Sequence, residues 1–253
     1  MHVILTGATG LVGSGVLDTM IKMKDITKIS IITRRPVQMA EDAKDPRINV
    51  IIHKDYEKYD AELLEKLKGA KGCVWALGIS QTQVTAEEYV KITKTYALEA
   101  AKAFKDLASE EQPFNFVYVS GSGATTEPGR FSAIFARVKG ETELALAELR
   151  RQYPNLHASS VRPAYVDASA HAAIQSYLPN KALALRLLEP LLGPPVRLGF
   201  KSFHSPTEPI GRVMTEIALG RHQDQFVAGK GVQMVGRFPI IENTVLRRLA
   251  GLQ

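Results

Sequence analysis

The chain has 253 residues, of which 45% are hydrophobic and 23% charged, and its formal net charge is +6 at pH 7. This length allows one substantial core with a small appended lobe. Basic residues are interspersed among nearly as many acidic ones and form no stripe with aromatic residues, so the charge does not indicate nucleic-acid binding. The single cysteine, Cys73, excludes an internal disulfide.

The apolar run that begins beside Met1 predicts a first strand and leaves no room for a signal or transit peptide. No apolar run approaches the roughly 20 residues needed to span a bilayer. We therefore expect a soluble, cytoplasmic protein with no membrane partner.

The first fifteen residues predict a phosphate-binding loop. An apolar run from Val3 to Leu5 leads into TGATGLVG at 6–13, which has the spacing GxxGxxG, and then into a helix. Glycine is needed where φ is positive, where backbone approaches a pyrophosphate, and where the helix packs closely on the strand. The N-terminus of the helix then offers backbone N–H groups to an anion.

Strand-like and helical patterns alternate further along the chain. Strands are expected at 29–32, 48–52, 73–77, 116–119 and 157–161, and helices after Gly13 and at 61–67, 86–107 and 131–151. Strands that are almost continuously apolar and alternate with helices indicate a parallel sheet covered on both faces. The expected fold class is α/β, a doubly wound parallel sheet of the Rossmann type with a small C-terminal substrate lobe.

From Ala168 onward the alternation fades and prolines accumulate. We expect residues 1–167 to form a NADP-binding Rossmann core, and 168–253 to form a substrate-side lobe with closing elements of the same domain. The apolar stretch Leu183–Leu192 contains charged residues and a proline. It fits a pocket-covering helix or a dimer contact better than a membrane anchor. A homodimer is therefore one of the assemblies that the sequence allows.

The residues after the second strand favour NADP over NAD. An acid at this position would accept the ribose 2′-OH of NAD, whereas arginine accommodates the 2′-phosphate of NADP. The chain has Arg34 and Arg35 here and no acid. A solvated pair of arginines is the alternative interpretation.

Taken together, these motifs resemble the short-chain dehydrogenase/reductases, in particular their atypical or extended branch. The likeness runs from residue 2 to about 167 and rests on TGATGLVG (6–13), the two arginines, Asp55 and Tyr56, WALG (75–78), VSGSGA (119–124), VKGETE (138–143) and VRPA (161–164). Within that branch, the chain is most similar to the Tat-interacting oxidoreductase-like proteins, which share a Tyr-Ala/Val pair, as at Tyr96 and Ala97, and a Lys-Gly-Glu motif.

The resemblance implies a role for each matching position. Residues implied to bind the cofactor are Gly7, Thr9, Gly10, Leu11, Val12, Gly13, Arg34, Arg35, Asp55, Tyr56, Ala76, Leu77, Gly78, Lys139, Pro163 and Ala164. Asp55 and Tyr56 would border the adenine, and Lys139 would bind the nicotinamide ribose. Ser122 matches the serine that hydrogen-bonds a substrate carbonyl, with Ser120 as the second choice.

One position departs from the family pattern. The active-site pair of the family is Tyr-x-x-x-Lys. This spacing places the two residues on one helix face, where the lysine amine stabilises a phenolate. Here Phe135 stands four residues before Lys139. Phenylalanine has no proton to give, and general acid catalysis typically contributes about 10²- to 10⁴-fold. Tyr165 and Tyr96 are the candidate replacements, although both are also ordinary pocket-wall residues.

Other chemistry is weakly supported by the sequence. The six histidines show no metal-ligand spacing and one cysteine cannot form a thiolate site, so we expect no metal. His171 and His204 fall in the expected substrate lobe, where either could act as an acid or base.

Three functional hypotheses follow. The first is an NADP(H)-dependent oxidoreductase acting on a small carbonyl compound or alcohol, with Ser122, Lys139 and Tyr165 as catalytic candidates. The second is a redox-inactive NADP(H)-binding regulatory or interaction protein. The third is a non-redox isomerase or lyase that uses the same pocket. The fold alone does not separate them.

Overall fold

A computed structural model describes residues 1–109, 111–178, 195, 197 and 199–252. Its main sheet has eight strands in the order β3-β2-β1-β4-β5-β6-β10-β9. These strands are β1 (His2–Thr6), β2 (Lys28–Thr33), β3 (Ile48–Ile52), β4 (Ala70–Trp75), β5 (Phe114–Val119), β6 (Leu156–Arg162), β9 (Val232–Val235) and β10 (Phe238–Glu242). All neighbouring strands pair in parallel except β10 and β9, which are antiparallel.

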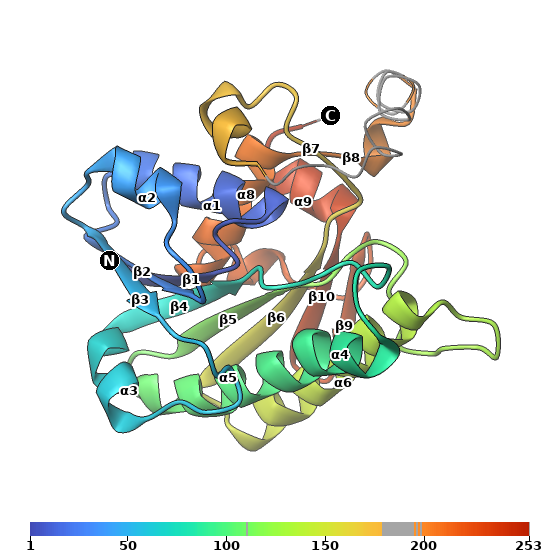
Figure 1. Ribbon diagram of the computed structural model, residues 1–253. Helices are drawn as coiled ribbons and strands as arrows, with labels where there is room; N and C mark the ends of the chain where they lie inside the picture. Colours follow the sequence, from blue (N-terminus) through green and yellow to red (C-terminus); the bar gives the residue numbers. More distant parts are fainter. Residues whose placement is uncertain (110, 179–194, 196, 198, 253) are drawn as a thin grey trace.

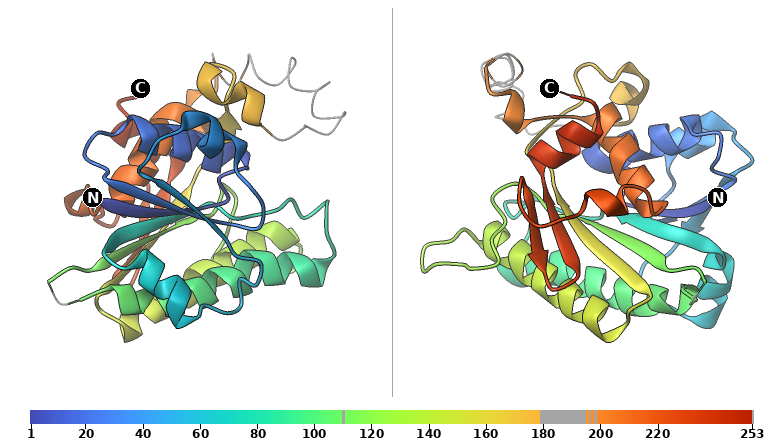
Figure 2. Two further views of the ribbon diagram at one scale, coloured as in Figure 1. Left: turned by 60° about the vertical axis from the view of Figure 1, so that its left-hand side comes forward. Right: turned by 180° about the vertical axis from the view of Figure 1, so that it is seen from behind.

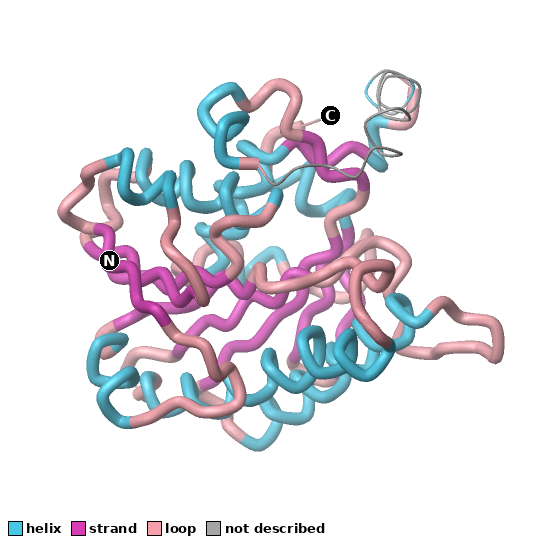
Figure 3. The backbone as a smooth tube through the Cα atoms, in the orientation of Figure 1, coloured by secondary structure: helices cyan, strands magenta, loops and turns pink. Residues whose placement is uncertain are grey.

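Helices cover both faces of this sheet (Figures 1 and 3). On one face lie α1 (Leu11–Lys22), α2 (Gln38–Ala43), α8 (Thr207–Ala218) and α9 (Asn243–Leu249). On the other face lie α3 (Ala61–Leu67), α4 (Ala86–Val90), α5 (Tyr96–Phe104) and α6 (Ile134–Gln152). The expected doubly wound α/β sheet is thereby confirmed, and its order 3-2-1-4-5-6 is the arrangement that binds dinucleotides at the carboxyl ends of the strands.

Each face of the sheet has its own apolar core. On the α1 side, β-branched and aliphatic residues such as Val3, Leu17 and Val213 are fully buried. On the α5 side, aromatic residues such as Trp75 and Phe116 dominate, and their rings stack with centroids 5.8 Å apart. The two cores explain why the strands are apolar throughout rather than alternating.

The expected long helix at 86–107 is interrupted. A π-helical turn, η1 (Lys91–Thr95), separates α4 from α5, and a short 3-10 turn, η2 (Lys105–Leu107), follows. The expected helix at 131–151 begins later, at Ile134, and Phe131 before it is 95% exposed. Both differences lie within segments whose helical character the sequence predicts.

The C-terminal segment contributes to the main sheet as well as to the region beyond it. β9 and β10 form a hairpin whose turn contains Gly236 at φ +59°, and β10 pairs with β6 (Figure 2, right). Beyond β6, a two-stranded parallel ribbon pairs β7 (Tyr165–Asp167) with β8 (His204–Pro206). Short 3-10 turns follow β7 and precede β8 and β9, at η3 (Ala172–Tyr177), η4 (Lys201–Phe203) and η5 (Gln223–Gln225).

The stretch Leu183–Leu192, expected to be a pocket-covering helix or a dimer contact, lies outside the described residues. Among the described helices, none combines the length and the hydrophobicity that a membrane span requires.

Candidate functional site

The loop between β1 and α1 is built around two glycines that the fold itself requires. Gly7 has φ +68°, and a Cβ there would lie 2.3 Å from the carbonyl oxygen of Ala76. A Cβ at Gly13 would lie only 2.0 Å from the carbonyl oxygen of Gly7. Gly10 differs, because its φ is −92° and its Cβ position meets only the Gly7 oxygen, at 3.3 Å. Packing within the chain therefore accounts for Gly7 and Gly13 far better than for Gly10.

The N-terminus of α1 is open toward this loop. Gly10 is the N-cap residue, and no side chain of the described residues caps the helix. The first N–H groups of a helix have no intrahelical partner, so those of Leu11, Val12 and Gly13 are available to a ligand. An uncapped N-terminus with this geometry attracts phosphate groups.

A cavity of about 410 Å³ adjoins the loop. It is lined by Gly7, Thr9, Thr33, Arg34, Arg35, Tyr56 and Leu77. Both arginine side chains are exposed, and Arg35 donates from Nη2 to Thr9 Oγ1 at 3.2 Å. A cavity of this size that presents two guanidinium groups next to an uncapped helix N-terminus suits an anionic ligand.

Tyr56 and Asp55 play different parts at the cavity. The Tyr56 ring is 1% exposed and packs in the aromatic core, and its hydroxyl donates to the carbonyl oxygen of Ile32 at 3.1 Å. Burial raises the pKa of Tyr56 to about 12, so its hydroxyl stays neutral. Asp55 is exposed, and its carboxylate accepts from the backbone N–H of Glu57 at 3.1 Å. Asp55 therefore shapes the turn and is not among the residues that line the cavity.

The segment after β4 borders the glycine loop. The backbone N–H of Leu77 donates to Thr6 Oγ1 at 3.3 Å, and the Ala76 carbonyl lies against Gly7. Nothing lies within 4 Å of the Cβ position of Gly78. The expected cofactor positions 76–78 thus lie beside the loop and cavity.

A second group of predicted residues lies where the loop after β5 meets α6. Lys139 Nζ donates to the carbonyl oxygen of Ser120 at 2.5 Å and lies 3.6 Å from the Cβ position of Gly121. One helical turn earlier, the Phe135 ring lies 3.5 Å from the Cβ position of Gly123. Phe135 and Lys139 therefore face the same loop, in the arrangement that the four-residue spacing predicts.

Among the described residues, no carboxylate lies in direct contact with the Lys139 ammonium. Burial lowers the pKa of Lys139 to about 8, while the charge of Glu143 raises it. Glu143 is itself buried and pairs with Arg162 through Oε2 and Nη2 at 2.5 Å, and Ser160 also donates to it. The Glu143 carboxylate is thus paired with the Arg162 guanidinium and not with the Lys139 ammonium.

The two candidate serines occupy different environments. The Ser120 hydroxyl is buried and has no hydrogen-bond partner among the described residues. Ser122 is exposed, and its backbone N–H donates to the carbonyl oxygen of Pro163 at 2.8 Å. Ser122 is therefore the more accessible of the two hydroxyl groups.

The structure places the candidate replacement tyrosines in different parts of the molecule. Tyr165 begins β7, directly after Pro163 and Ala164, and so adjoins the loop that contains Ser122. Tyr96 stacks on Tyr56 with ring centroids 5.6 Å apart, which places it at the aromatic wall behind the cavity.

One polar cluster was not predicted from the sequence. Asp167 accepts from Arg197 Nε at 2.6 Å and interacts with His204 Nε2 at 2.9 Å. These residues are separated by 30 and 37 positions, and no local pattern links them. The pairing of β7 with β8 brings Asp167 and His204 together, and Arg197 joins them from the segment before β8.

A group of possible metal ligands, Asp18, His171 and Glu208, lies near the far end of α1, with ligand atoms within 4.8 Å of one another. Lys22 Nζ is 2.7 Å from both Asp18 Oδ2 and Glu208 Oε1. His171 Nε2 is 2.8 Å from Asp18 Oδ2, and its Nδ1 bonds Thr207. The ammonium group already supplies the positive charge that this cluster needs.

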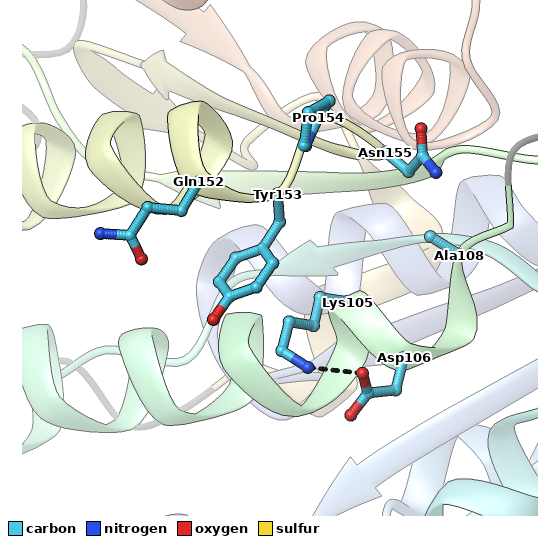
Figure 4. A pocket seen from close by; sticks show the side chains of 7 residues that line it. All are labelled: Lys105, Asp106, Ala108, Gln152, Tyr153, Pro154 and Asn155. Carbon is cyan, nitrogen blue, oxygen red and sulfur yellow. Dashed lines mark hydrogen bonds and ion pairs between the residues drawn. The ribbon is translucent and has the colours of Figure 1, made fainter.

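Another cavity, of about 210 Å³, is lined by residues in the connections that lead into β5 and β6 (Figure 4). Its lining includes Lys105, whose ammonium pairs with Asp106 and lies over the Tyr153 ring. With its one cation already neutralised, this cavity offers less to an anion than the cavity at Arg34 and Arg35 does.

The order of the main sheet and the glycine loop at the start of α1 define a Rossmann-type fold. A short chain dehydrogenase/reductase from Saccharomyces cerevisiae aligns with a TM-score of 0.62 over 98% of both chains, at 14% identity. DesIV, a dTDP-glucose 4,6-dehydratase from Streptomyces venezuelae solved with NAD, gives 0.64 over 99% of this chain and 79% of that one, at 16% identity. These likenesses establish the fold alone.

The chain belongs to the same family as the leucinostatins biosynthesis cluster protein T of Purpureocillium lilacinum. The two are 36% identical over 248 residues, which is 90% of this chain and 89% of the relative. The botcinic acid biosynthesis cluster B protein 16 of Botryotinia fuckeliana is 43% identical over 157 residues, 62% of this chain and 99% of that protein. No protein-family model matches the sequence.

A more distant relative corrects one expectation. Protein fmp52, mitochondrial, of Emericella nidulans is 30% identical over 143 residues, 56% of this chain and 58% of that protein. Relatives in two further fungi also carry the mitochondrial designation. The expected cytoplasmic location is therefore wrong. It rested on an apolar first segment, which is a core strand and carries no information about the compartment.

Proposed function

We propose that the protein is an NADP(H)-dependent oxidoreductase that interconverts a small carbonyl compound and its alcohol. The observation that carries this proposal is the cavity of about 410 Å³ in which Arg34 and Arg35 face the glycine loop. Within this proposal, residues 1–167 hold the cofactor and parts of 168–253 contact the substrate. The finer resemblance to Tat-interacting oxidoreductase-like proteins supports the same assignment.

The residues present fit a phosphorylated dinucleotide. The N–H groups at the start of α1 would hold the pyrophosphate, with Gly10 giving it room to approach. Arg34 would contact the 2′-phosphate as a charge-assisted donor. Arg35, already bonded to Thr9, would contact it while bracing the loop. When bound, the cofactor supplies or accepts the hydride.

The site's own residues would then handle the substrate oxygen. Ser122 is the exposed hydroxyl beside Pro163 and would donate a hydrogen bond to the carbonyl. Lys139 is fixed by the Ser120 carbonyl and would hold the ribose. Phe135 provides a wall but no proton, so a proton donor must come from elsewhere, and Tyr165 is our candidate.

Phe135 also favours a second candidate function. A pocket that binds NADP(H) and lacks its usual acid is what we expect of a redox-inactive regulatory protein. The two proposals agree on the cofactor and differ in turnover.

The test is to mix the purified protein and NADPH with a panel of quinones, activated ketones and aldehydes, and to follow the absorbance of the reduced nicotinamide. Consumption of NADPH with stoichiometric alcohol formation supports the oxidoreductase. Tight binding of NADPH without consumption across the panel refutes it and favours the regulatory protein.

A further inference from the structure

The ribbon of β7 and β8 carries titratable side chains on one face. Tyr165 and His204 are partners in its register. Tyr165 and Asp167 are two residues apart on one strand and so point to the same side. His204 Nε2 lies 2.9 Å from Asp167 Oδ2. All three side chains therefore share this face, with the phenol and the imidazole at neighbouring positions.

Asp167 is a fixed, ionised anchor for the imidazole. Its side chain is 3% exposed and also accepts from Arg197 and from the backbone N–H of Ser169. Burial alone would raise the pKa of Asp167, but the hydrogen bonds from Arg197, Ser169 and His204 outweigh it and hold the pKa well below its usual range. An ionised carboxylate only accepts, so the His204 Nε2 carries the hydrogen and Nδ1 is left to exchange a proton.

The start of the β7–β8 ribbon lies beside the proposed site. The carbonyl oxygen of Pro163, two residues before Tyr165, accepts from the backbone N–H of Ser122. Tyr165 is half-buried, and 19% of the His204 side chain is exposed, so both groups can be reached.

The charged groups packed around His204 come from three elements. Asp167 lies on β7, and Arg197 precedes β8. From α9, Arg247 donates through Nη1 to the backbone carbonyl of His204 at 2.8 Å, which directs this contact to the backbone rather than to the imidazole. The carboxylate of Asp167 is in direct contact with the ring.

We propose that Tyr165 delivers the proton that Phe135 cannot, and that His204, oriented by Asp167, is the positioning residue that returns a proton to Tyr165. This rests on the proposed oxidoreductase function. In reduction, the carbonyl carbon gains the hydride of NADPH and the π electron pair moves to oxygen, which takes the Tyr165 proton. The protonated His204 then passes its Nδ1 proton to the phenolate and becomes a neutral imidazole. Solvent returns a proton to Nδ1.

Nuclear magnetic resonance of the full chain, labelled with ¹⁵N at histidine, tests the geometry without turnover. We expect the neutral form of His204 to carry its hydrogen on Nε2, and Tyr165→Phe to shift the Nδ1 resonance. A hydrogen on Nδ1 of the neutral ring, or ring resonances that are unchanged in Tyr165→Phe, would overturn the proposal. Tyr153→Phe, in the connection between α6 and β6, should leave these resonances unchanged.

Kinetics test the role itself. We expect Tyr165→Phe to lower kcat for carbonyl reduction roughly 100-fold or more, with the dissociation constant for NADPH unchanged. His204→Gln keeps a donor for Asp167 but cannot carry the relayed proton. It should lower kcat for carbonyl reduction and leave KM for the carbonyl compound unchanged, a split that a purely structural role would not produce. His157→Gln, on β6, is the matched control.

The outcomes separate this inference from the proposed function. If the native enzyme reduces a carbonyl compound and kcat is unchanged by both Tyr165→Phe and His204→Gln, the relay is overturned and the oxidoreductase stays in place. A native protein that binds NADPH and reduces nothing overturns both.

Discussion

Alanine substitutions at Gly13 and Gly10 should separate the structural glycines from the ligand-facing one. At Gly13 the new methyl carbon would lie 2.0 Å from the Gly7 carbonyl oxygen, over an ångström inside normal contact. Either the loop or α1 must shift. Overpacking of this kind costs about 1–3 kcal/mol, and the lower entropy of the unfolded alanine chain recovers only about 0.4–1 kcal/mol. We expect Gly13→Ala to lower the free energy of unfolding by about 1–2 kcal/mol.

At Gly10 the same methyl group meets one atom at 3.3 Å, in a backbone conformation that alanine adopts freely. Alanine is a weaker N-cap residue than glycine, which lowers stability, but it also reduces the entropy of the unfolded chain, which raises stability. We therefore expect the free energy of unfolding to change by no more than about 1 kcal/mol. The methyl group would still stand where the pyrophosphate approaches. We therefore expect the dissociation constant for NADPH to rise about 10-fold or more, equivalent to about 1.4 kcal/mol.

The assay combines urea unfolding, followed by the fluorescence of Trp75, with calorimetric titration of NADPH. Trp75 is the single tryptophan and is fully buried, so its emission reports on the core. Gly129→Ala, where the nearest atom to the new carbon is 3.9 Å away, is the matched control. A Gly13→Ala protein as stable as the native one would refute the loop geometry. An unchanged NADPH affinity in Gly10→Ala would place the phosphate site elsewhere.

Three further predictions follow from the site and the core. Phe135→Tyr should create or raise carbonyl reduction, because it places a phenol near the Lys139 ammonium, and Lys139→Ala should remove that gain. If NADPH consumption does not rise in Phe135→Tyr, position 135 does not reach the reacting oxygen. Arg34→Ala should reduce the preference for NADPH over NADH more than Arg35→Ala does, because Arg35 also binds Thr9; calorimetry that finds equal losses would reject this division of roles. Burial and the charge of Lys28 lower the pKa of His2 from 6.5 to about 4. As the pH falls from 6.5 to about 4, His2 therefore binds a proton in the unfolded chain before it does so in the folded protein. The free energy of unfolding should drop by about 3 kcal/mol over this range. His2→Gln should flatten this part of the urea-unfolding profile, and an unaltered slope would show that His2 does not cause it.

The first two-thirds of the fold could be predicted because its strands are apolar and β-branched and the glycines of its first loop have a recognisable spacing. The expected strand at 48–52 and the helix at 61–67 coincide with β3 and α3. The π-helical turn was not predictable, because its residues have ordinary helical propensity and only packing selects the wider turn. The β9–β10 hairpin was missed, although a two-residue turn at Gly236 and Arg237 between apolar runs is a recognisable hairpin signal.

The site was predictable to the extent that its residues lie in local motifs. Gly7, Arg34 and Leu77 come from three separate β-α connections, and the structure gathers them around one cavity. The pair of Asp167 and His204 has no such motif, because its two members meet only through a ribbon formed by distant segments.

The most direct test of the account is calorimetric titration of the native protein with NADPH and with NADH. Charge-assisted bonds from arginine to a phosphate contribute about 1.5–3 kcal/mol each. We therefore expect NADPH to bind at least about 10-fold more tightly than NADH, with a preference that weakens as salt concentration rises. Equal affinities for the two nucleotides, or binding of neither, would contradict the central claim that this cavity holds NADP(H).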